Sequence, residues 1–97
     1  MTQVTVIATL HARPGQEAAL EARMRTMIEA TRREAGCIRY DMHRAADDAA
    51  SLVMVEYWVS AEALQSHDDS AHMAALVADL PALIDRPVEI RKLAPVV

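Results

Sequence analysis

The 97-residue sequence has no phenylalanine, one cysteine and two glycines. A single cysteine excludes an internal disulfide framework, and so few glycines exclude the glycine-rich loops that hold phosphates of ATP, NAD or flavin mononucleotide. No apolar run approaches the roughly 20 residues of a membrane helix, and no signal peptide is visible at the N-terminus. A net charge of −4 argues against nucleic acid or an anionic membrane as partner. We therefore expect a soluble cytoplasmic protein with one domain over residues 1–97.

Hydrophobic periodicity predicts four strands and two helical regions. The order is strand-helix-strand-strand-helix-strand, which is the ferredoxin-like α+β unit with a four-stranded antiparallel sheet. Gly36 is expected to end the long helix in a left-handed conformation, and Ser60 and Ser70 are expected to cap helical stretches. The strands are predicted over residues 3–11, 37–44, 51–59 and 88–93, the long helix over 16–35, and the shorter helices between 60 and 80.

The first and third strands are apolar on both faces, which places them in the middle of the sheet. Ferredoxin-like helices cover only one face, so the other face would remain exposed in a monomer. We therefore predict a homodimer that packs sheet to sheet.

Glu56 and Trp58 lie two residues apart and so share one strand face. An acid beside an indole suits a pocket that stacks a flat ring and offers one polar contact. Alternatively, Glu56 pairs with an arginine at the rim and Trp58 fills the core. Tyr40, on the same strand face as Ile38 and Met42, could orient a substrate oxygen or could be a core residue with its hydroxyl at the rim.

His67 is placed near the end of the first short helix, before two aspartates. Because histidine titrates near neutral pH, it could be a general base or a donor to a phenolate. Alternatively, it is a surface residue stabilised by those carboxylates. The helical period puts His72 off the face of His67, with a break expected at Ser70, so the two histidines predict no metal site. Cys37 is interpreted as a small packing residue.

Three motifs together resemble the antibiotic biosynthesis monooxygenase family: Gly36-Cys37-x-x-Tyr40, Glu56-x-Trp58, and Ala63-Leu64-x-x-His67-x-x-Ser70-x-His72-Met73. The resemblance implies a dimeric α+β barrel with a pocket between sheet and helices in each subunit. It also implies a monooxygenase without metal or organic cofactor, acting on quinols or polycyclic phenols. In that chemistry the deprotonated substrate reduces O₂ directly. Its matched positions make His67 a base or hydrogen-bond partner, Trp58 a ring wall, and Glu56 and Tyr40 secondary polar groups, and His72 is taken as a substrate contact.

Besides the monooxygenase, we consider two other enzymatic activities and one non-enzymatic role. A haem-degrading branch of the superfamily uses an asparagine on the first strand, and this sequence has no asparagine, which disfavours haem degradation. A second branch isomerises small phosphorylated or lactone-type substrates, for which Arg39 or Arg44 could hold a phosphate. The third alternative is a dimeric small-molecule binding protein without catalysis.

Overall fold

A computed structural model describes residues 3–97 and contains one four-stranded antiparallel sheet with strand order β2-β3-β1-β4. The predicted ferredoxin-like order, with the first and third strands in the middle, is confirmed. The elements along the chain are β1 (Val4–His11), α1 (Glu17–Arg32), β2 (Cys37–Ala45), β3 (Asp48–Trp58), α2 (Ala61–Asp68), α3 (Ala71–Asp79), the 3₁₀ turn η1 (Leu80–Ala82) and β4 (Glu89–Leu93).

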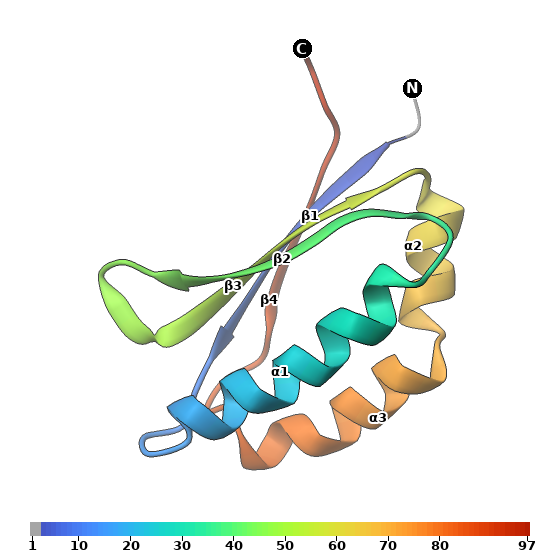
Figure 1. Cartoon of the computed structure of the whole chain (residues 1–97). Helices are drawn as coiled ribbons and strands as arrows, with labels where there is room; N and C mark the ends of the chain where they lie inside the picture. Colours follow the sequence, from blue (N-terminus) through green and yellow to red (C-terminus); the bar gives the residue numbers. More distant parts are fainter. Residues whose placement is uncertain (1–2) are drawn as a thin grey trace.

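The three α-helices lie on one face of the sheet (Figure 1). Side chains alternate along the two central strands, because successive residues of a strand point to opposite faces. The helix-facing residues are buried: Val6, Ala8 and Leu10 on β1, and Leu52, Met54, Glu56 and Trp58 on β3. The predicted assignment of Glu56 and Trp58 to one strand face is therefore correct.

Helix α1 packs on that face through a stripe at helical spacing, with Leu20, Met24 and Met27 fully buried. The helix ends at Arg32, three residues earlier than predicted. Gly36 is not left-handed, because Gly15 is the one residue with positive φ in the described chain. Gly36 is instead needed for close approach, since a Cβ there would collide with the Cβ of Ala63 in α2.

Both predicted serine caps are confirmed: the side chains of Ser60 and Ser70 accept hydrogen bonds from the backbone N–H groups of Ala63 and Met73. One detail of the sheet differs from the prediction. The register of β2 shifts between Cys37 and Arg39, so Ile38 is 53% exposed instead of sharing the inner face with Tyr40. Val77 of α3 is also 57% exposed.

The opposite face of the sheet carries Ile7, Val53, Val55 and Tyr57, all half-buried. No helix of residues 3–97 covers this face (Figure 1). The described helices include none with the length and apolar character needed to cross a membrane.

Candidate functional site

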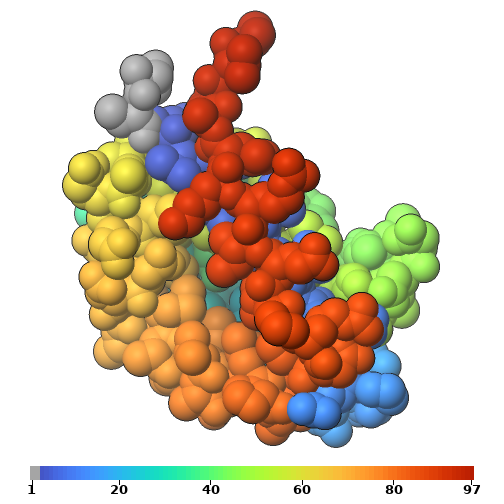
Figure 2. Space-filling model, turned by 180° about the vertical axis from the view of Figure 1, so that it is seen from behind, coloured from blue at the N-terminus to red at the C-terminus, as the bar shows by residue number. Residues whose placement is uncertain are grey.

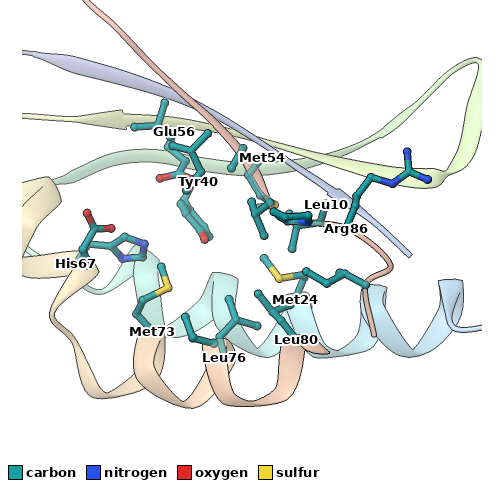
Figure 3. Close-up of a pocket in the computed structure, with 18 of the residues that line it drawn as sticks. Leu10, Met24, Tyr40, Met54, Glu56, His67, Met73, Leu76, Leu80 and Arg86 are labelled. Atoms are coloured by element: carbon teal, nitrogen blue, oxygen red, sulfur yellow. The ribbon is translucent and has the colours of Figure 1, made fainter. Parts of the chain in front are cut away.

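A cavity of about 760 Å³ lies between the helix-facing side of the sheet and the helices. It reaches the surface in a hollow between the α2–α3 region and the C-terminal segment that contains β4 (Figure 2). Its wall is mainly apolar, with Leu10, Met24, Met54, Met73, Leu76 and Leu80 around it (Figure 3). Three of the predicted site residues also line it: Tyr40, Glu56 and His67.

Glu56 reaches the cavity from near the C-terminal end of β3 and accepts a hydrogen bond of 3.0 Å from the indole N–H of Trp58. Burial raises the pKa of Glu56 to about 7, while the Trp58 hydrogen bond lowers it and the carboxylates of Asp68 and Glu34 raise it. A carboxyl group with this pKa changes charge at neutral pH, which suits proton transfer.

His67 comes from the last turn of α2 and is 1% exposed. Its ring lies 4.6 Å from the Trp58 ring and 5.6 Å from the Tyr40 ring, measured between centroids. Figure 3 shows the ring extending from α2 toward the cavity, near Tyr40 and Met73. The histidine is therefore part of the cavity wall and not a solvated surface residue.

Glu34 forms a hydrogen bond with the Nδ1 side of the His67 ring. This residue was not predicted from the sequence. Its Oε2 lies 2.8 Å from Nδ1 of His67. A carboxylate oxygen only accepts hydrogen bonds, so Nδ1 carries the hydrogen and Nε2 is left as the proton-accepting nitrogen. Glu34 stands in the turn after α1, 33 positions from His67. Residues so far apart in the sequence show no local spacing that would predict their contact. The one available signal was an acidic residue two positions before Gly36.

His72 also reaches Glu34, with Nε2 2.8 Å from the same Oε2 atom. The expectation that the His67 and His72 rings diverge is wrong. The break at Ser70 turns the chain between α2 and α3, and both imidazoles then point to one carboxylate, with ring centroids 6.0 Å apart. Of the described residues, Glu34, His67 and His72 form the group whose ligand atoms could hold a metal ion.

Tyr40 is buried on β2, and its ring packs in T-shaped geometry against the rings of both Trp58 and His67. Burial, followed by the nearby Glu56 carboxylate, raises the pKa of Tyr40 far above its ordinary value. The phenol therefore keeps its proton at neutral pH and can donate a hydrogen bond to an anionic oxygen.

Trp58 and His72 are placed next to the cavity but are not among the residues that line it. Trp58 is fully buried behind His67 and Glu56, and His72 contacts Glu34. Their contact with a substrate stays a prediction.

Arg39 and Arg44, the candidate phosphate ligands, do not line the cavity either. They form ion pairs with Asp41 and Glu21 on the outside of the molecule.

Cys37 is half-buried and packs against the core, as the sequence predicted. Burial raises the pKa of its thiol, and the carboxylates of Glu34 and Glu56 raise it further. The thiol is therefore protonated and a poor nucleophile at neutral pH.

The chain is similar to proteins of one known family. The family model described as antibiotic biosynthesis monooxygenase matches residues 3–79. The chain is 40% identical over 92 residues to a Mycobacterium tuberculosis protein named "Putative monooxygenase Rv0793", covering 95% of this chain and 90% of the relative. The crystal structure of PA3566 from Pseudomonas aeruginosa superposes with a TM-score of 0.93 at 34% identity, covering 100% of this chain and 97% of the other. A crystal structure named as an antibiotic biosynthesis monooxygenase has a TM-score of 0.89 at 26% identity, covering 96% of this chain and 98% of the other.

Proposed function

The chain belongs to the antibiotic biosynthesis monooxygenase family, and from this premise we propose that it oxidises a quinol-like or polycyclic phenolic molecule with O₂, without metal or organic cofactor. The observation that carries the proposal is the His67 ring in the cavity wall, with Nδ1 bonded to Glu34 and Nε2 left to accept a proton. The coarser conclusion, a monooxygenase-like protein, rests on the family alone.

The size and character of the cavity favour an aromatic substrate of more than one ring. A volume of about 760 Å³ lies in the upper part of the roughly 300–1,000 Å³ range of small-molecule sites. Three methionines, Met24, Met54 and Met73, line it, and thioethers pack well against aromatic rings. An apolar wall also excludes water from an electron-rich anion, which strengthens its polar contacts.

His67 acts as the general base in this proposal. Its Nε2 takes the proton of a substrate hydroxyl group, and Glu34 stabilises the resulting imidazolium through Nδ1. The phenolic hydrogen of Tyr40 supports the substrate oxyanion.

The oxygen chemistry balances without a further reductant. The phenolate transfers one electron to O₂, and the two radicals combine at a ring carbon that bears hydrogen, forming a carbon–oxygen bond. The hydroperoxide then loses the carbon-bound proton as its oxygen–oxygen bond breaks, leaving a quinone and water. One oxygen atom of O₂ enters the product and the other leaves as water. The substrate supplies all four electrons needed to reduce O₂.

Glu56 is the second proton-transfer group of the proposal. A pKa of about 7 allows it to receive the carbon-bound proton and release it to water in the same turnover. Trp58 acts through Glu56, because its N–H sets the carboxyl position and favours its charged form.

We also propose that two chains pack through the uncovered sheet face to give a homodimer. Ile7, Val53, Val55 and Tyr57 form an apolar centre on this face, and contiguous apolar surface of that kind is typical of subunit contacts.

The proposal is tested by oxidation of a panel of hydroquinones and polycyclic phenols by chelator-treated protein under ¹⁸O₂. We expect one ¹⁸O atom in the product and one in water, at a rate above autoxidation. Turnover of a phosphorylated or lactone substrate without O₂ uptake would favour the isomerase. Saturable binding of an aromatic ligand without turnover would favour the binding protein.

A further inference from the structure

We propose that Glu34, His67 and His72 form a binding site for one divalent first-row transition metal ion, with Zn²⁺ as its representative. The three side chains offer one carboxylate oxygen and two imidazole nitrogens. This donor set is found in zinc sites that keep a fourth position for water.

The distances between the donor atoms support the site. The three ligand atoms lie within 4.8 Å of one another, and Oε2 of Glu34 is 2.8 Å from each nitrogen. Bonds of about 2.0–2.2 Å to a tetrahedral zinc hold ligand atoms roughly 3.3 Å apart. Small side-chain rotations reach that arrangement, and the side chains of Glu34 and His72, 18% and 30% exposed, have room for them.

The backbone fixes all three donors at the ends of rigid elements. Glu34 is in the turn after α1, where its N–H bonds the carbonyl of Thr31. The Ser70 hydroxyl donates to the carbonyl of His67 and accepts from the N–H of Met73, so one serine fixes the corner between the two histidines. Donors held in this way lose little conformational entropy when an ion binds.

The surrounding charge favours a cation. The carboxyl group of Glu56 lies within electrostatic reach of Glu34, and both Asp68 and Glu34 act on Glu56 as like charges. The guanidinium of Arg32, the last residue of α1, is used by the carbonyl of Tyr40 and the carboxylate of Asp41. An ion at the three donors therefore enters a region with excess negative charge.

Metal binding would change the proton on His67. A metal ion takes the lone pair of Nδ1, which forces the remaining hydrogen onto Nε2. The ring then donates a hydrogen bond toward the cavity and no longer accepts a proton there. The loss of the base rests on the proposed function, whereas the metal site and the change of tautomer do not.

Binding is measured on the full chain after chelator treatment, by calorimetric titration with Zn²⁺ and by the visible absorption of added Co²⁺. We expect one ion per chain, and at least tenfold weaker binding in each of His72→Ala and Glu34→Gln. The control His43→Gln removes an exposed imidazole of β2 and should bind like the wild type. Circular dichroism verifies that each variant is folded.

Long-range ¹H–¹⁵N spectra of the imidazoles provide a second readout. On addition of Zn²⁺, the His67 resonances should change from the pattern of the Nδ1–H tautomer to that of the Nε2–H tautomer. The same change is expected in the control His43→Gln. The proposal is overturned if the wild type binds no saturating zinc at micromolar concentrations. It is equally overturned if folded His72→Ala binds like the wild type, or if zinc leaves the His67 tautomer unchanged. None of these measurements depends on oxygen uptake, so they fail or succeed separately from the proposed function.

Discussion

The indole of Trp58 donates its N–H to the carboxyl group of Glu56, two residues earlier on the same strand, over 3.0 Å. Both side chains are buried on the helix-facing side of the sheet. The pair therefore keeps a titratable group at the cavity wall, where burial holds its pKa near neutrality.

The stability of the protein should fall with rising pH because of Glu56. The native carboxyl has a pKa of about 7 against an ordinary value of 4.5, so the native state binds more protons than the unfolded chain between these values. Stability from this group is full below pH 4.5 and is lost as pH rises through 7, by about 3 kcal/mol in total.

Urea unfolding of the wild type and Glu56→Gln, at one protein concentration across a pH range of about 4.5–7.5, measures this contribution. The Glu56→Gln variant lacks the titration, so the free energy of unfolding of the wild type should decrease relative to it as pH rises. A difference between the two proteins that does not change with pH would contradict the buried carboxyl.

Trp58→Phe should raise the pKa of Glu56 above its wild-type value. The indole hydrogen bond favours the charged carboxylate, and phenylalanine removes it while keeping an aromatic ring in the core. A ¹³C NMR titration of the Glu56 carboxyl group measures the change. Tyr57→Phe, on the opposite face of β3, is the matched control and should leave that pKa in place. An unchanged or lower value in Trp58→Phe would refute the assigned role of the indole.

Glu34→Gln should lower kcat by roughly 10–100-fold while changing KM little, because a carboxamide can donate to Nδ1 and place the hydrogen on Nε2. The matched control is Glu29→Gln, which removes a carboxylate of α1 that is paired with exposed Arg33. Steady-state oxygen uptake compares the two variants. Equal losses of kcat in both would show that Glu34 does not position His67.

Val55→Glu should convert the dimer to a monomer. The substitution places a charge at the centre of the uncovered sheet face, where it would be buried without a partner in the subunit contact. Val77→Glu makes the same change at an exposed position of α3 and should leave the oligomeric state intact. Sedimentation velocity at micromolar concentrations distinguishes the species. Sedimentation of the wild type as a monomer would contradict the proposed homodimer.

The fold was predictable because strand and helix periods are local signals. The period of two along a strand predicts that Glu56 and Trp58 share one face, and the structure agrees. The serine caps were also readable from a few neighbouring residues. The same local signals do not report a shift of register, which is why Ile38 was assigned to the wrong face.

The site was only partly predictable, since its key contacts join distant segments. Glu34 contacts His67 and His72 only when α1, α2 and α3 are packed together. No spacing in the sequence predicts these contacts. Gly36 is a similar case, because its role depends on how closely Ala63 of α2 approaches it.

Oxygen uptake by chelator-treated wild type and His67→Gln, on the same panel of hydroquinones and polycyclic phenols, tests the central claim most directly. His43→Gln is the control for an exposed imidazole, and protein-free reactions give the autoxidation rate. The account predicts uptake above autoxidation in the wild type and in His43→Gln, and a fall of roughly 100-fold or more in His67→Gln, the contribution expected of a general base. Equal enzymatic rates in wild type and His67→Gln would contradict His67 as the base, and uptake at the autoxidation rate in all three proteins would contradict the oxygenase itself.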